Sequence, residues 1–175
     1  MIDPSAIGDD LLACLDAALE THPEPPAVTM LRTGTGEADA LIGLNGAVEC
    51  CSGLGIVRWA GTDPTAGPTL EPYSVATQCQ PFGWAFRYEL VIYRCPPTTS
   101  GRLPTSAEWG EAAAIQSEDL SALIRAVVCC FAEKEWSWTI GTSEPVGIEA
   151  QCTGVRLPVT VSVPGDQWPD CCTSA

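Results

Sequence analysis

Cysteine is the residue type with the greatest chemical potential in this chain, which has ten cysteines among its 175 residues. Six of them form three adjacent pairs, at positions 50–51, 129–130 and 171–172. Zinc sites and thiol redox centres usually separate two cysteines by two to four residues, so that both sulfurs reach one ion or each other. That spacing does not occur here. The sequence therefore predicts neither a metal site nor a redox centre.

Two roles remain for the cysteines. A buried cysteine behaves as a small hydrophobic residue, and cysteines pair as disulfides once a protein meets an oxidising medium. Adjacent cysteines rarely bond each other, so each would find a partner elsewhere, for example Cys50 or Cys51 with Cys129 or Cys130. Connectivity is not decided by sequence. The cysteines considered for disulfides are Cys50, Cys51, Cys79, Cys95, Cys129, Cys130, Cys152, Cys171 and Cys172.

The other residues that could do chemistry are few. His22, the only histidine, lies among prolines, where we expect an exposed loop residue, so a Ser–His or Cys–His pair is not predicted. The acid pairs Asp9-Asp10 and Glu118-Asp119 are expected at helix starts, where carboxylates stabilise the helix dipole. The turn at Gly34-Thr35-Gly36 lacks the further glycine and the lysine of a phosphate-binding loop. We predict no catalytic residue, no cofactor and no metal, and hence no enzyme.

The six tryptophans suggest packing and partner contacts rather than a sugar site. Trp84, Trp136 and Trp138 fall in runs with strand-like patterning, where core or interface packing is the commoner role. Trp168 lies in an acidic C-terminal segment and could anchor that segment on a partner.

The charge excludes one class of function. With 22 acids, 8 bases and a net charge of −14, the protein repels phosphate backbones, so specific DNA or RNA binding is not predicted. Acidity could serve solubility alone, or a surface past which DNA slides.

We expect no membrane span, because no apolar run reaches about 18 residues. We also expect no signal peptide, because the N-terminal residues lack a basic region, and hence folding in a reducing cytosol.

Helices are predicted at two places. Residues 5–20 have leucines at helical spacing, with Ser5 or Asp9 as the cap, and the prolines after His22 end this helix. Residues 105–131 predict one long helix or two, beginning at Thr105-Ser106 with Glu108 in the first turn. The apolar stripe expected to be buried on it comprises Ile115, Leu120, Leu123, Ile124, Val127, Val128 and Phe131.

Strands fill most of the remainder. Alternating side chains are clearest over residues 82–95, with a bend or bulge near Arg87, and over 149–163, where Pro158 suggests an edge position or a bulge. The other predicted strands are 27–32, 47–51, 55–60 and 136–140. This order predicts an α+β fold, a mixed or antiparallel β-sheet flanked by the N-terminal helix and a longer helix near residues 105–131. We expect a single domain over 1–163 and an acidic C-terminal tail over 164–175.

Four segments together resemble a known family of proteins. They are Glu49-Cys50-Cys51-x-Gly53-Leu54 with Val57-Arg58-Trp59, Tyr88-Glu89-Leu90-x-Ile92-x-Arg94-Cys95-Pro96, Val127-Val128-Cys129-Cys130, and Cys152-Thr153-Gly154-Val155. In combination and order they resemble small neck proteins of long-tailed phages (siphoviruses) of actinobacteria, particularly the tail terminator or a neighbouring head–tail joining protein. The likeness spans roughly residues 5–163.

This resemblance implies a structural virion protein with a helix-flanked sheet. Such proteins form a ring, commonly a hexamer, that caps the tail tube and joins it to the head connector. The implied partners are further copies of the chain, the major tail tube protein and the connector or stopper protein, while genomic DNA passes through the lumen without specific binding. Assembly would occur in the host cytoplasm, and the mature location is the virion neck. No catalytic residue is implied. Cys171-Cys172 lies outside the region of likeness, and it could tie adjacent subunits by a disulfide after lysis.

Other interpretations stay open. The chain could be a different phage connector, such as the head–tail stopper or adaptor. From a different class, it could be a secreted binding domain with disulfides, or a small thiol enzyme with one activated cysteine.

Overall fold

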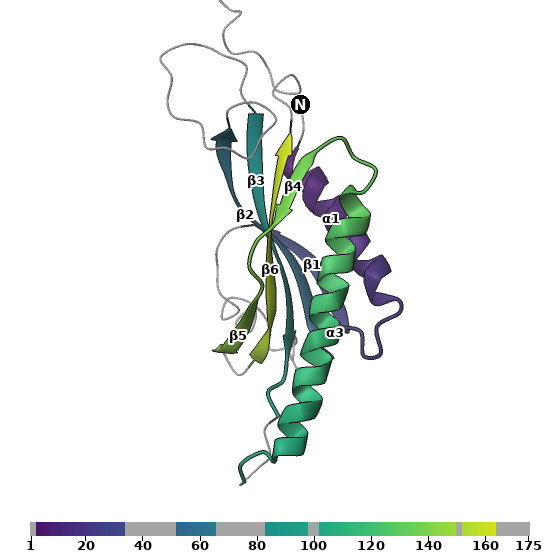
Figure 1. Cartoon of the computed structure of the whole chain (residues 1–175), viewed down its shortest axis with the longest axis vertical. Helices are drawn as coiled ribbons and strands as arrows, with labels where there is room; N and C mark the ends of the chain where they lie inside the picture. Colours follow the sequence, from purple (N-terminus) through teal and green to yellow (C-terminus); the bar gives the residue numbers. More distant parts are fainter. Residues whose placement is uncertain (1–2, 34–51, 66–82, 98–101, 150–151, 164–175) are drawn as a thin grey trace, which may run out of the picture.

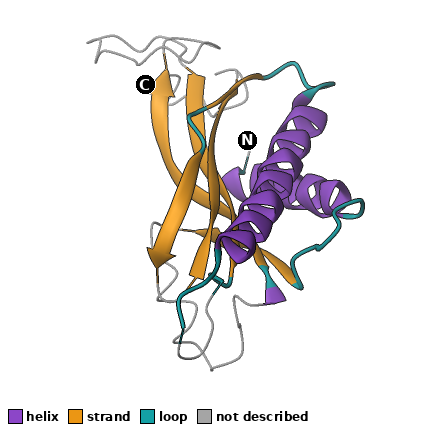
Figure 2. Cartoon of the chain, turned by 60° about the horizontal axis from the view of Figure 1, so that its bottom comes forward, coloured by secondary structure: helices purple, strands orange, loops and turns teal. Residues whose placement is uncertain are grey.

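Two helices cover one face of a six-stranded sheet (Figures 1 and 2). The structure is a computed structural model that describes residues 3–33, 52–65, 83–97, 102–149 and 152–163. The predicted α+β class is confirmed. Its elements are α1 (Pro4–Leu19), β1 (Val28–Thr33), β2 (Leu54–Thr65), β3 (Gly83–Arg94), α3 (Ser106–Phe131), β4 (Ser137–Ile140), β5 (Glu144–Glu149) and β6 (Cys152–Val163).

The sheet is mixed and runs in the order β1-β2-β3-β6-β4, with β5 also paired to β6. β1 is parallel to β2, and the other pairs are antiparallel. The irregularity expected near Arg87 lies in the partner strand, because the register of β2 shifts between Trp59 and Gly61, opposite Tyr88 and Arg87. β5 was not predicted, and β2 continues to Thr65, beyond the predicted end of that strand at residue 60.

Pro158 is not at an edge, which corrects the expectation. It pairs with Glu89 across the central β3–β6 ladder. On its other side, β4 pairs with β6 from Val159 onward and β5 up to Arg156, so Pro158 lies at the break between the two short strands. Its carbonyl accepts a hydrogen bond from the N–H of Gly141 at 2.8 Å. A missing N–H is tolerated at this point because, among the described residues, no strand pairs with β6 there.

The main core lies between the helices and the sheet. Alternate residues of β3 and β6 face the helices, which explains the period of two in both strands. Trp84, Trp136 and Trp138 pack against this core, as predicted. The buried members include Ile7, Leu11, Leu15, Phe86, Tyr88, Leu90, Ile92, Leu123, Val127, Phe131, Val155, Leu157, Val159, Val161 and Val163.

The remaining apolar side chains divide between a second cluster and the surface. A smaller cluster on the opposite face of the sheet joins Leu54, Ile56, Val91 and Tyr93 to Val146 of β5. Two members of the predicted helical stripe, Ile124 and Val128, are exposed instead. They lie on the flank of α3 that turns away from the sheet, so the stripe predicted from hydropathy was too wide.

Both helices begin with a side-chain cap. Asp3 caps α1 and accepts a hydrogen bond from the N–H of Ser5. Hydrogen bonding by the Ser5 side chain, followed by its N–H, lowers the pKa of Asp3. The expected caps, Ser5 and Asp9, were wrong. α3 is one continuous helix capped by Thr105, as predicted. Among the described residues no helix combines the length and the hydropathy that crossing a bilayer requires.

Tyr88 connects the start of α1 to the sheet. Its hydroxyl donates a 2.7 Å hydrogen bond to the carbonyl of Pro4, and burial, with a smaller contribution from Asp3, raises the pKa of Tyr88. Predicted elements over residues 47–51 and the tail 164–175, with Trp168, lie outside the described residues.

Two glycines test how closely the strands and the helix are packed. A Cβ at Gly154 of β6 would overlap the carbonyl oxygen of Ile92, whereas a Cβ at Gly110 of α3 meets no atom within 4 Å. Gly154→Ala should therefore lower the free energy of unfolding by about 1–3 kcal/mol. Gly110→Ala should raise it by up to about 1 kcal/mol, because alanine favours a helix interior. Urea denaturation of both variants measures this, and equal effects would contradict the β3–β6 register.

Candidate functional site

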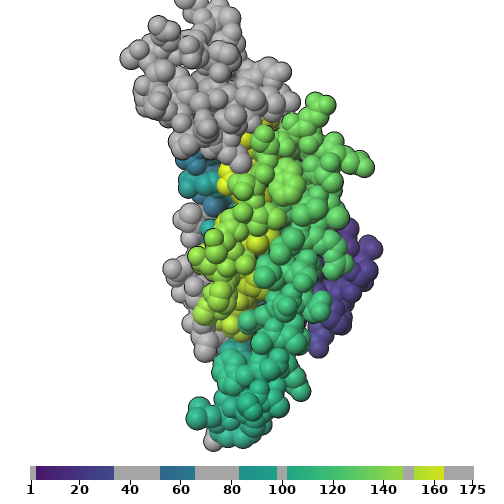
Figure 3. Space-filling view, in the orientation of Figure 1, coloured from purple at the N-terminus to yellow at the C-terminus, as the bar shows by residue number. Residues whose placement is uncertain are grey.

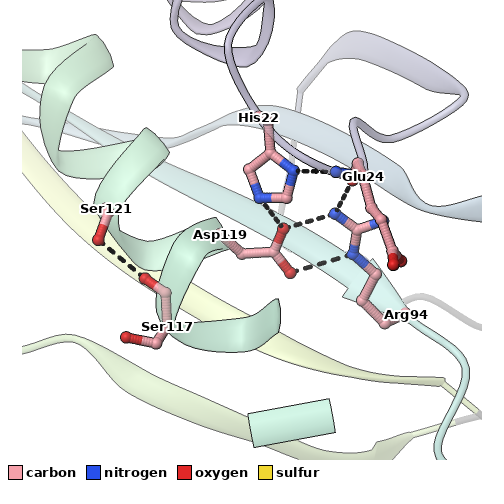
Figure 4. Close-up of polar contacts among 6 residues, drawn as sticks. All are labelled: His22, Glu24, Arg94, Ser117, Asp119 and Ser121. Carbon is pink, nitrogen blue, oxygen red and sulfur yellow. Dashed lines mark hydrogen bonds and ion pairs between the residues drawn. The ribbon is translucent and has the colours of Figure 1, made fainter. Parts of the chain in front are cut away.

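A fully buried carboxylate, Asp119, lies in the second half of α3. Arg94, at the end of β3, donates from Nε to Oδ2 at 3.0 Å and from Nη2 to Oδ1 at 2.6 Å. His22, in the turn after α1, places Nε2 at 3.2 Å from Oδ1 (Figure 4). Nε2 lies close to this oxygen without a well-aligned hydrogen bond. The two-point contact of arginine with carboxylate is the strongest arrangement available to this pair.

The turn after α1 is bound to the same cluster by its backbone. Arg94 Nη2 also donates to the carbonyl oxygen of Glu24 at 2.7 Å, and the N–H of Glu24 donates to His22 Nδ1 at 3.0 Å (Figure 4). Because Nδ1 accepts this bond, the proton of the neutral imidazole is on Nε2, facing Asp119. The cluster of His22, Glu24, Arg94 and Asp119 therefore joins three segments of the chain.

Two expectations about these residues were wrong. His22 is buried, with 9 % of its surface exposed, rather than a solvated loop residue. Asp119 lies in the body of α3, not at a helix start, because α3 begins at Ser106. The helical periodicity around Asp119 would have predicted its burial. Asp119 precedes Leu123 by four residues and Val127 by eight, so it lies on the core-facing side of the helix and needs a buried cation.

The polar side chains of this cluster contact one another and nearby backbone atoms. The carboxylate of Asp119 contacts Arg94 and His22, and the other side-chain hydrogen bonds of the group go to backbone atoms of Glu24. Within the described ranges, no group of three or more His, Cys, Asp or Glu side chains is placed to hold a metal ion. The arrangement fits a brace between α1, β3 and α3.

A disulfide provides a second brace between the helices. Cys14 of α1 is bonded to Cys130 of α3, with their Cα atoms 5.6 Å apart and a separation of 116 positions in sequence. A disulfide was predicted, but not this pairing. Cys14 and Cys130 each lie on the stripe by which their helix meets the other, whereas Cys129, one residue earlier, turns outward as an exposed free thiol.

Two more of the predicted disulfide cysteines, Cys95 and Cys152, are also disulfide-bonded. The others named for that role, Cys50, Cys51, Cys79, Cys171 and Cys172, lie outside the described residues.

The sheet face opposite the helices has charged side chains at its centre, and we call it the arginine face. Arg58 pairs with Glu89, and Arg156 lies 4.0 Å from Glu89 and 3.5 Å from Glu144. Arg87 pairs with Asp63 at 2.9 Å. Because Arg32 is the register partner of Arg58, it lies on the same face. The face thus presents Arg32, Arg58, Arg87 and Arg156 with Asp63, Glu89 and Glu144.

The first half of α3 extends beyond the sheet, and we call residues 102–118 the arm (Figure 3). None of the helical residues from Ser106 to Glu118 is buried. They form a helix roughly 20 Å long, and Gln116 near its end donates a hydrogen bond to Thr153 of β6 at 3.2 Å. Leu103 and Trp109 are large apolar side chains of the arm, and 89 % of Leu103 and 50 % of Trp109 are exposed.

The arm is stiffened at its start. Thr105 and Glu108 form a reciprocal capping box, and Arg102 donates to both carboxylate oxygens of Glu108 at 2.6 and 2.8 Å. The bond from Arg102, followed by those from Thr105, lowers the pKa of Glu108 to about 2. This carboxylate is therefore ionised at neutral pH, where it accepts the hydrogen bonds that cap the start of α3.

Comparison with models of known protein families and with curated protein sequences finds no match for this chain. The resemblance to phage neck proteins stays a prediction.

Replacing Asp119 tests the buried brace. Asp119→Asn leaves Arg94 buried without a counter-charge, so the free energy of unfolding should fall by about 3–5 kcal/mol. Glu118→Gln, its exposed neighbour, is the matched control and should change stability by less than about 0.5 kcal/mol. Chemical denaturation at neutral pH measures both. Equal effects of the two variants would show that the cluster does not brace the fold.

Removing Cys14 tests the link between the helices. In non-reducing buffer Cys14→Ser should lower the free energy of unfolding by about 2–5 kcal/mol, because a long loop loses its closure. With a reductant present, the difference from the wild type should nearly vanish. The reduced Cys130 thiol still has a partner, since its Sγ lies 3.4 Å from the carbonyl of Asp10. Cys129→Ser is the control, and an equal loss from it would contradict the pairing.

Proposed function

We propose that this protein is a structural subunit of a phage neck, which forms a ring at the head–tail junction, terminates the tail tube and joins it to the head connector. The proposal follows the family resemblance, with the tail terminator preferred over the stopper or adaptor. The partners are then further copies of the chain, the tail tube protein and the connector, in the virion.

The observation that supports an assembly role is the arm. None of its residues from Ser106 to Glu118 is buried, so this part of the helix gains little stabilisation from tertiary packing. It nevertheless has a complete capping box and an ion pair at its start. Trp109 remains exposed on this helix, and Leu103 on the segment just before it. Large exposed apolar side chains on a preformed element are typical of protein–protein contacts.

The charge suits a channel for DNA. A net charge of −14 repels phosphate, so DNA would pass such a subunit without binding to it. The exposed acids of α1, namely Asp9, Asp10, Asp16 and Glu20, extend this acidity over the helical layer. Solubility alone would require less acidity than this, since a small domain is well served by a net charge of about 2–8.

One observation favours a second candidate. The Cys14–Cys130 bond and the disulfides of Cys95 and Cys152 fit a secreted binding domain, since disulfides persist in oxidising surroundings. In the neck proposal the same bonds form when lysis releases the virion into an oxidising medium.

Deleting the gene from the virus that encodes the chain tests the proposal. Electron microscopy should then show tail tubes of irregular, mostly excessive length and heads without tails, because nothing caps the tube or joins it to the head. Supplying the protein in trans should restore joined tails of uniform length.

Joined tails of normal length in the absence of the gene would refute the neck function. Recovery of the protein only outside virions, as a free disulfide-bonded monomer, would favour the second candidate.

A further inference from the structure

We propose that the arm of one copy docks, head to tail, on the arginine face of a second copy. This inference rests on the proposed ring function, because it names the two surfaces by which the subunits would meet. The two surfaces belong to different parts of the molecule, the arm to the start of α3 and the arginine face to the far side of the sheet (Figures 1 and 2).

The arm combines apolar and acidic side chains. Leu103 and Trp109 provide exposed apolar surface. The arm has one base, Arg102, which pairs with Glu108, and two further acids, Glu111 and Glu118, which are both exposed. An occupant of this surface should therefore offer basic groups together with some apolar surface.

The arginine face offers both. Its described side chains comprise four arginines (Arg32, Arg58, Arg87, Arg156) and three acids (Asp63, Glu89, Glu144). Arg87 is 54 % exposed and Arg156 33 %. Val28, an exposed apolar side chain of edge strand β1, lies on the same face, four residues before Arg32. A guanidinium is also a favourable partner for the indole ring of Trp109.

Charge favours the arginine face over the helical layer as the surface of a second copy on which the arm docks. On the helical layer the exposed acids of α1 would repel Glu111 and Glu118 of an approaching arm. On the arginine face bases outnumber acids in a chain whose net charge is −14. Of these two described surfaces, it is therefore the one on which an acidic arm of an identical chain meets more bases than acids, although Arg58, Arg87 and Arg156 already pair with acids of the same face.

The proposed contact also has the symmetry that a ring needs. Because the arm and the arginine face differ, each copy uses its arm on one neighbour and its face on the other. Such heterologous contacts close into a ring when the rotation between copies allows it. An isologous dimer would leave no surface for a third copy.

Sedimentation velocity of the full chain over a concentration series tests the contact. The wild type should self-associate. The arm variant Glu111→Arg/Glu118→Arg should weaken self-association by at least about tenfold, although it makes the chain less negative and so reduces general repulsion. The control Glu133→Arg/Glu135→Arg makes the same change of charge beyond the other end of α3 and should not weaken it. Circular dichroism confirms that each variant is folded.

Mixing two variants identifies the surfaces. The face variant Arg32→Glu/Arg87→Glu should also fail to associate alone. Mixed with the arm variant in equal amounts, it should restore association, because the reversed arm meets the reversed face and the native arm meets the native face. Trp109→Ala, which changes no charge, should weaken association of the otherwise wild-type chain.

Three results would overturn the inference: a wild type that stays monomeric at every concentration, an arm variant that associates as well as the control, or a mixture that does not recover. None of them bears on the neck function, which the gene deletion tests by itself. Conversely, joined tails in the deletion mutant would remove the neck function and leave a measured head-to-tail contact intact.

Discussion

The contact between Asp119 and Arg94 is the constraint on which the rest of the arrangement depends. A buried carboxylate without a cation would cost several kcal/mol, so α3 can pack on the sheet only in the position that brings Asp119 to the end of β3. That position also determines how much of α3 is covered. Asp119 is the first buried residue of the helix, and everything before it forms the arm. His22 and Glu24 extend the constraint to the turn after α1.

The disulfide between Cys14 and Cys130 also stabilises the helical layer, but by a covalent bond. Cys14–Cys130 joins α1 to α3 near the end of α3 that is opposite the arm, so the helix is held at its centre by charge and at its end by a covalent bond. Reduction leaves the Cys130 thiol beside the carbonyl of Asp10. This sulfur therefore keeps a hydrogen-bond acceptor beside it, which is compatible with folding in a reducing compartment and later formation of the disulfide.

Local patterns in the sequence were enough to predict the parts of the fold that depend on local chemistry. The alternation from Phe86 to Ile92 and the capping residues Thr105 and Glu108 predicted β3 and the start of α3 correctly. β5 was missed because Pro145 and Gly147 disfavour a strand, and its formation depends on pairing with β6. The position of His22 and the pairing of Cys14 with Cys130 depend on how distant segments pack, which no local pattern contains.

Acidity limits the ways in which copies of this chain can meet. Two molecules with a charge of −14 each repel one another in most orientations. Apolar contacts through Trp109 and Leu103 could supply affinity in several of these orientations, since apolar contacts have little directional preference. Charge discriminates among them, because an acidic arm is tolerated where arginines predominate and rejected elsewhere. Orientation is then selected by electrostatics and held by apolar burial, and a single orientation is what a closed ring of identical subunits requires.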